Sequence, residues 1–128
     1  QKNLCLKRME EMFRNLDSGM TSERYFEMQE QMGLEVVEED IPPSLEDLPE
    51  VIGLAIEIFN QLGDRVYPEI GYIGKDYVNF EYLLKHYGIE EEHEKEFFLE
   101  VLVWLDARAI KKSAEQLKRE YDKIKRKK

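Results

Sequence analysis

The sequence predicts an all-α fold, a small helical domain of short helices packed on one long C-terminal helix, from three observations. Apolar residues recur at spacings of three and four in several segments, which is the period of a helix with one buried face. Residues 91–125 contain neither proline nor glycine, so that one helix can run through them. The length of 128 residues is that of one domain. We therefore expect a single helical domain over residues 1–128.

The first part of the chain predicts two helices and a linker. Ser22 is the expected N-cap of a short second helix, and Gly33 is its expected C-terminal stop. Residues 34–48 hold acids and prolines but no Lys or Arg, which predicts an acidic, proline-containing linker. The first helix, over residues 2–16, carries one apolar stripe, which consists of Leu6, Met9, Phe13 and Leu16.

A third helix is predicted from Pro49 to Gly63, and it should form the centre of the core. Apolar residues cover most of its circumference, namely Val51, Ile52, Ala55, Ile56, Ile58, Phe59 and Leu62. In the following loop, Gly71 and Gly74 predict backbone with positive φ. The loop side chains expected to fold over the core are Tyr67, Ile70, Tyr72, Ile73 and Tyr77. A two-turn helix follows, with Asn79 as its N-cap and Gly88 as its stop.

The long C-terminal helix is predicted over residues 91–125. A heptad seam runs along it at spacings of four and three, through Val103, Ala107, Ile110, Ala114, Leu117, Tyr121 and Ile124. At about 50 Å, this helix exceeds the width of so small a globule, so that its end projects or is covered. The predicted partner-binding residues are Ile110, Ala114, Leu117, Tyr121, Ile124, Lys118, Arg119, Lys125 and Arg126.

Charge is distributed unevenly along the chain. Residues 107–128 hold ten Lys/Arg and three Asp/Glu, whereas residues 1–106 hold nine and 25. Such a polarised chain can pair its own ends, meet a second copy, or offer its basic end to an acidic protein partner. A homodimer through the C-terminal helix and a contact with nucleic acid through the basic residues both stay open.

No motif in the sequence predicts catalysis or a cofactor. A phosphate-binding loop is excluded because Glu69 replaces its first glycine and Asp76 replaces its hydroxyl residue. The G-x-x-G spacing of Gly71 and Gly74 matches a KH clamp, but the sequence shows no strands for the sheet of that domain. We expect neither enzyme activity nor a cofactor.

Metal binding is not expected either. His86 and His93, the only histidines, are separated by Gly88 and lack the i, i+4 geometry of a two-histidine site. Asp106 is the carboxylate for which burial is expected, with a salt-bridged structural role rather than a catalytic one.

The composition favours a cytoplasmic location without a membrane span. The single cysteine, Cys5, cannot form an internal disulfide. No apolar run approaches the ~20 residues of a membrane helix, and the first residues lack the features of a signal peptide.

Four segments carry a resemblance to a group of viral proteins. These are SERYFEMQEQMG (22–33), EEDIPPSLEDLPE (38–50), IGYIGKDY (70–77) and WLDARAIKKSAEQLKREYDKIKRKK (104–128). From about Met20 onward, the chain resembles small proteins of tailed bacteriophages of the marine myovirus type. The resemblance implies a tail-assembly or baseplate-associated factor in the infected host cell, with a phage structural or assembly protein as its partner. It also implies that residues 1–19 are an N-terminal extension.

The resulting hypothesis is a non-enzymatic protein-interaction factor that acts in virion assembly. The alternative is a nucleic-acid-associated packaging or regulatory factor that uses the basic C-terminal helix.

Overall fold

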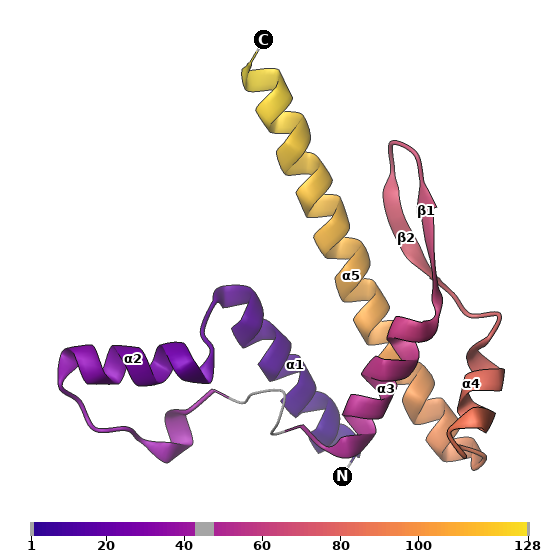
Figure 1. Cartoon of the computed structure of the whole chain (residues 1–128), viewed down its shortest axis with the longest axis horizontal. Helices are drawn as coiled ribbons and strands as arrows, with labels where there is room; N and C mark the ends of the chain where they lie inside the picture. The colour runs from indigo at the N-terminus through magenta and orange to yellow at the C-terminus, as the bar shows by residue number, and fades with distance from the viewer. Residues whose placement is uncertain (1, 43–47, 128) are drawn as a thin grey trace. The chain divides into compact units, whose positions relative to one another are not determined.

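The computed structural model describes residues 2–42 and 48–127, and these residues form two compact units. Unit 1 covers Gln1–Gly53 and unit 2 covers Leu54–Lys128. The described residues contain five α-helices, one short 3₁₀ helix and one antiparallel pair of strands (Figure 1). The all-α prediction is therefore wrong, because a β-hairpin interrupts the helices. The single domain stays a prediction.

Unit 1 begins with two helices at the predicted places. Helix α1 spans Lys2–Ser18 and buries Met9 and Met12, so the buried face is shifted from the predicted stripe, whose Leu16 is exposed. Helix α2 spans Ser22–Met32 and ends at Gly33, whose φ of 68° confirms the predicted stop.

The N-cap of α2 is Thr21 and not the predicted Ser22. Its Oγ1 accepts a hydrogen bond from the Arg24 N–H at 3.2 Å. Both residues have a hydroxyl suited to capping, and the residue with extended backbone, φ −93° and ψ 168°, is Thr21. The sequence alone could not distinguish two adjacent hydroxyl residues.

The predicted linker contains ordered backbone in its described part. Glu38–Asp40 form the 3₁₀ helix η1. The Tyr25 hydroxyl accepts from the Val37 N–H at 3.3 Å, and the Gln29 amide donates to the Glu35 carbonyl at 2.7 Å. Helix α2 therefore holds the backbone of residues 35–37. Residues 43–47 of the linker lie outside the described residues.

Helix α3 spans Glu50–Gln61 and passes from unit 1 into unit 2. All seven predicted core residues of this helix region are buried or partly buried, as expected for its circumference of apolar side chains. Helix α4 spans Phe80–His86, with Gly88 at φ 76° as its stop. Asn79 is its N-cap residue, as predicted, but its side chain makes no capping hydrogen bond.

Helix α5 spans Glu92–Arg126, which confirms the long uninterrupted C-terminal helix. The Glu91 carboxylate caps it, since it accepts from the N–H groups of His93 and Glu94 at 3.1 and 3.0 Å. Lys and Arg in its last turn complement the negative end of the helix dipole. The 35 residues of α5 extend over roughly 50 Å.

The segment predicted as a loop is a hairpin. Strand β1 spans Gly63–Tyr67, and strand β2 spans Gly71–Asp76. Pro68, Glu69 and Ile70 make the turn between the paired residues Tyr67 and Gly71, and Glu69 has a positive φ of 72°. Gly71 and Gly74 have φ values of 88° and 127°, so the predicted positive angles are confirmed.

Not all loop side chains fold over the core. Tyr72, Ile73 and Tyr77 are partly buried, whereas Tyr67 and Ile70 are exposed. Pairing of Arg65 with Gly74 and of Val66 with Tyr72 leaves Ile73 as the extra residue of a β-bulge. Tyr67 precedes the turn and Ile70 lies in it, so both stay exposed at the far end of the hairpin.

Candidate partner-binding surface

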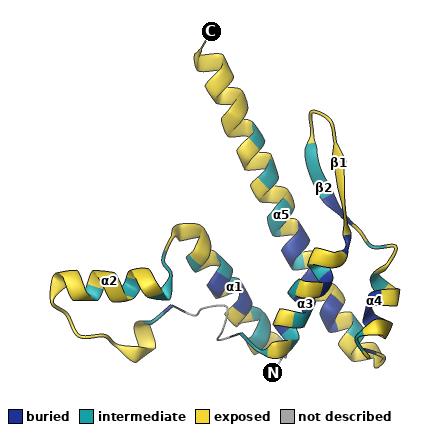
Figure 2. Cartoon of the chain, viewed as in Figure 1, coloured by how far each residue is buried: buried dark blue, intermediate teal, exposed yellow. Residues whose placement is uncertain are grey.

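The first half of α5 is anchored in the core of unit 2. Its buried side chains are Phe97, Phe98, Val101, Leu102, Leu105 and Asp106. Helices α3 and α4 supply the other buried apolar residues of this unit, together with one residue directly after α3 and one in the turn after α4. These residues are Ala55, Ile58, Leu62, Leu83, Leu84 and Ile89. Figure 2 shows that the buried residues of α5 are confined to this half and that its C-terminal half is exposed or partly buried.

Asp106 fixes the hairpin to α5. The Tyr72 hydroxyl donates to its Oδ1 at 2.5 Å, and the Tyr77 hydroxyl donates to its Oδ2 at 3.0 Å. The backbone N–H of Lys75 lies 3.2 and 3.1 Å from the two carboxylate oxygens. Only 7% of Asp106 is exposed. A buried carboxylate needs such donors, since an uncompensated charge is costly in the interior.

The expected burial of Asp106 is confirmed, but the expected salt bridge is not found. None of the ion pairs among the described residues involves Asp106. Phenol hydroxyls and a strand N–H take the place of a cation, because the hairpin that the sequence analysis missed supplies them. The role is structural: the carboxylate joins two elements that are about 30 residues apart in the sequence.

Burial and the contact with Asp106 change the pKa of the two tyrosines that donate to it. Burial raises the pKa of Tyr72 and Tyr77 far above the ordinary tyrosine value, and the hydrogen bonds to Asp106 raise it further. Both phenols therefore stay protonated as donors over the ordinary pH range.

Close approach of the hairpin to α5 requires Gly74. A Cβ atom at this position would lie 3.1 Å from Arg65 Nη2 and 3.3 Å from Asp106 Oδ2. Farther along, the Tyr72 N–H donates to Ser113 Oγ at 3.4 Å. Strand β2 thus follows α5 from Asp106 to Ser113 (Figure 1).

Lys75 on strand β2 is buried like Asp106 on α5, with 7% of it exposed. Its Nζ donates to Asp64 Oδ1 at 2.6 Å and to the Leu62 carbonyl at 3.2 Å. The same ammonium lies 4.6 Å from the centre of the Phe59 ring. These contacts join both strands to the end of α3, so the hairpin has a second attachment.

The predicted seam reaches the hairpin contact at Ile110, whose Cδ1 would lie 3.5 Å from a Cβ atom at Gly74, and continues beyond it. We call its C-terminal part the tip stripe, which consists of Ile110, Ala114, Leu117, Tyr121 and Ile124. At 3.6 residues per turn, these residues fall within about 80° of one another. Ile110, Tyr121 and Ile124 are 37%, 52% and 56% exposed. Residues 118–127 are all exposed, whereas Leu117 is partly buried, so the uncovered part of the stripe among the described residues is the apolar face at Tyr121 and Ile124.

The four predicted basic residues do not share one face of the helix. Helical geometry places Lys118 and Lys125 about 60–80° from the middle of the tip stripe, and places Arg119 and Arg126 about 160–180° from it. Arg119 also donates from Nε to the Glu115 carbonyl at 3.5 Å. The structure therefore brings the five apolar residues together with two lysines, while the two arginines point the other way.

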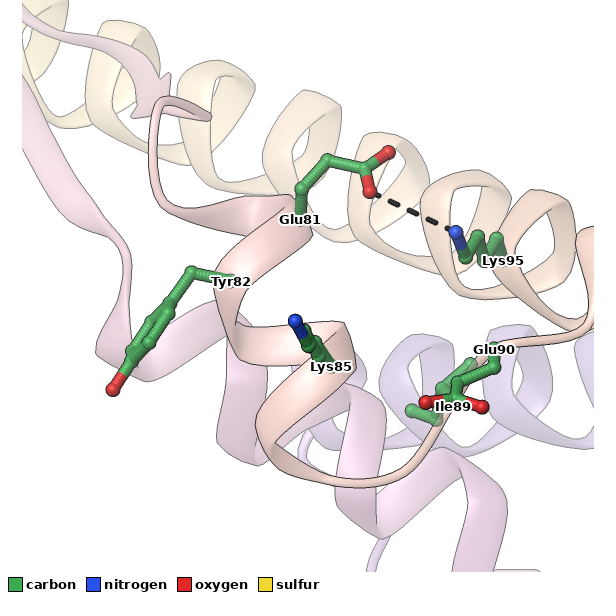
Figure 3. A pocket seen from close by; sticks show the side chains of 6 residues that line it. All are labelled: Glu81, Tyr82, Lys85, Ile89, Glu90 and Lys95. Carbon is green, nitrogen blue, oxygen red and sulfur yellow. Dashed lines mark ion pairs between the residues drawn. The ribbon is translucent and has the colours of Figure 1, made fainter.

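A surface hollow at the other end of unit 2 offers no comparable site. It has a volume of about 440 Å³ and is lined by Glu81, Tyr82, Lys85, Ile89, Glu90 and Lys95 (Figure 3). Glu81 and Lys95 point toward each other across it, with 3.7 Å between Oε2 and Nζ. Two of the charges that line the hollow are thus paired with each other, and its lining contains neither cysteine nor histidine as a nucleophile or base.

Residues 2–42 and 48–127 contain no group of three His, Cys, Asp or Glu side chains arranged to hold a metal ion. In the same part of the chain, no helix has both the length and the apolar character of a membrane span. Comparisons with protein-family models, with curated proteins and with solved structures find no match to this chain.

Proposed function

We propose that this chain is a non-enzymatic protein-interaction factor whose partner packs on the tip stripe of α5. The observation that carries the proposal is the exposed apolar face at Tyr121 and Ile124, on a helix whose other half is fixed in a core. Covering an apolar face of this kind with a partner removes it from water, which lowers the free energy of the complex. The hydrogen bonds between Asp106 and the hairpin fix α5 before a partner binds. Binding then orders fewer groups, which lowers its entropy cost.

The partner's chemistry follows from the residues beside the stripe. Lys118 and Lys125 flank it one heptad apart, so that they occupy equivalent positions on the helix. A helix with an apolar ridge and glutamates beside it would bury Tyr121 and Ile124 and pair with both lysines. Burial of these two half-exposed side chains contributes about 2–3 kcal/mol, and exposed ion pairs add about 0.2–1 kcal/mol each. Such a contact is transient rather than permanent.

As the biological setting we propose virion assembly of a tailed phage, with a structural or assembly protein as partner in the host cytoplasm. The resemblance of residues 20–128 to small proteins of marine myoviruses supports this setting. A transient helix-on-helix contact suits a factor that joins an assembly and leaves it.

The test uses a defined probe, a synthetic peptide with leucine at heptad positions a and d and glutamate at e and g. Fluorescence anisotropy measures its affinity for the full chain, with polyglutamate of equal charge as the control probe. We expect the peptide to bind and Tyr121→Ser/Ile124→Ser to weaken binding at least ~30-fold, which corresponds to the ~2 kcal/mol of lost apolar burial.

Two charge variants form a matched pair for the same assay. Lys118→Gln/Lys125→Gln and Arg119→Gln/Arg126→Gln remove the same charge from two sides of α5 that are about 100° apart. Only the lysine variant should weaken peptide binding. If polyglutamate binds as well as the peptide and the apolar variant binds normally, the contact depends on charge alone and the proposal is wrong.

A second candidate function, a nucleic-acid-associated factor, is favoured by the exposure of every Lys and Arg from 118 to 127. Phosphates would contact the basic side of the helix and leave the tip stripe uncovered. Retention on duplex DNA or RNA at ~0.15 M salt, lost in the arginine variant but not in Tyr121→Ser/Ile124→Ser, would establish it. No retention by the wild type ends this candidate.

A further inference from the structure

Unit 1 contains a segment whose chemistry is complementary to the tip stripe. Residues 34–41 hold Glu35, Glu38, Glu39 and Asp40 and no Lys or Arg. Three of their four apolar side chains are exposed, with Leu34 at 54%, Val36 at 49% and Val37 at 45%, whereas Ile41 is partly buried. We call this stretch the acidic segment. The acidic segment therefore combines exposed apolar side chains, which could cover the tip stripe, with carboxylates, which could pair with the lysines beside it.

The acidic segment is held in an ordered form by α2. The Tyr25 hydroxyl accepts from the Val37 N–H at 3.3 Å, and the Gln29 amide donates to the Glu35 carbonyl at 2.7 Å. Its C-terminal part is the 3₁₀ helix Glu38–Asp40. Because these contacts use side chains of α2 and the backbone of the segment, the apolar side chains of the segment stay available for a partner.

Length and charge of the two surfaces match. Eight residues of extended or 3₁₀ backbone reach about 16–26 Å, and the tip stripe from Ala114 to Ile124 extends about 15 Å along α5. The acidic segment carries four carboxylates, and residues 107–128 carry seven more Lys/Arg than Asp/Glu. Two tips placed against each other would instead bring like charges together, which disfavours a symmetric pairing of two α5 helices.

We propose that the acidic segment of one copy of the chain packs on the tip stripe of a second copy. The inference rests on the proposed function and names the partner as another copy of the same chain. Leu34, Val36 and Val37 cover Tyr121 and Ile124, and the carboxylates meet Lys118 and Lys125. Since each copy holds one of each surface, the contact is heterologous, and association continues into chains or closes into a ring.

Sedimentation velocity of the full chain over a wide concentration range tests this directly. We expect the average mass to rise with concentration at ~0.05 M salt and to fall back to that of the monomer at ~0.5 M, where exposed charges are screened. A monomeric mass at every concentration in low salt overturns the proposal.

Two variants separate this arrangement from a symmetric one. The tip variant is Tyr121→Ser/Ile124→Ser, and the segment variant is Val36→Ser/Val37→Ser/Glu38→Gln/Glu39→Gln. All six side chains are exposed, and the fluorescence of Trp104 and the circular dichroism of each variant check folding. Each variant alone should be monomeric. An equal mixture should form a dimer of twice the monomer mass and stop there, because only one intact surface of each kind remains. A segment variant that still associates by itself overturns the proposal in favour of pairing between tips.

Failure of this inference is distinguishable from failure of the proposed function. If the wild-type chain stays monomeric but binds the acidic heptad peptide, only the proposed association between two copies is wrong. If it stays monomeric and does not bind the peptide, both this inference and the proposed function are wrong.

Discussion

Replacing Asp106 by asparagine tests whether this carboxylate joins the hairpin to α5. Asparagine keeps the shape of the side chain and one acceptor oxygen, but its NH₂ group places a donor against a donor of the hairpin. The carboxylate accepts from two tyrosine hydroxyls and from the Lys75 N–H in a position that is only 7% exposed. Each hydrogen bond to a charged group contributes about 1.5–3 kcal/mol, and at least one is lost.

We therefore expect Asp106→Asn to lower the free energy of unfolding by about 2–4 kcal/mol. Trp104, the only tryptophan, lies in the same helix and reports unfolding by urea through its fluorescence. Asp122→Asn removes the same charge from an exposed position of α5 and should change stability by less than about 0.5 kcal/mol.

A double-mutant cycle with Tyr72→Phe measures the hydrogen bond itself. Because the Tyr72 hydroxyl lies 2.5 Å from Asp106 Oδ1, the two substitutions should be coupled by at least about 1 kcal/mol. Equal stability of Asp106→Asn and Asp122→Asn would refute the role of Asp106 in joining the hairpin to α5. Additive effects of Asp106→Asn and Tyr72→Phe would refute it as well.

Three further predictions concern the hairpin and its neighbours. The raised pKa values of Tyr72 and Tyr77 mean that the folded state keeps two protons that the unfolded state releases above pH ~10. Their contribution is complete below that pH and is lost as pH rises above it, so the urea midpoint should fall between pH ~9 and ~11 and fall less in Tyr72→Phe/Tyr77→Phe. Gly74→Ala should destabilise by about 1–3 kcal/mol, because φ is 127° and the added Cβ meets Arg65 and Asp106. Its control, Gly53→Ala, adds a Cβ in open space within α3 and should stabilise by about 0.5–1 kcal/mol in the same urea titration. Glu69→Gly should stabilise by up to about 1 kcal/mol, since glycine adopts the observed φ of 72° without strain, and an unchanged or lower midpoint would contradict this.

The helices could be predicted because their signals are local. Apolar spacing, glycine stops and a proline-free run place α2, α4 and α5 within a few residues of their observed bounds. The exposed seam of α5 follows from the same pattern, because a helix of about 50 Å extends beyond a small core. The positions of the tip stripe residues were thus available from the sequence.

The hairpin does not follow from the glycine pattern, because the glycines of this segment predict turns and no strands. Val66-Tyr67 and Tyr72-Ile73 are runs of strand-forming residues, and the turn between them contains proline and is followed by glycine, which is a hairpin signal. Gly74 within β2 disguised the strand, although a glycine there also marks close approach of another element. That element is α5, and its contact through Asp106 lies about 30 residues away, beyond the reach of local patterns.

The division of α5 at Ser113 has a consequence for how its sequence can change. Up to that residue, substitutions at the buried positions alter packing or the hairpin contact, so a screen for folded protein would detect them. From Lys118 to Lys127 every side chain is exposed, so such a screen would tolerate nearly any helix-forming residue there. The last three turns of α5 can therefore be replaced by a different helical sequence while the fold of the rest of the chain stays unchanged.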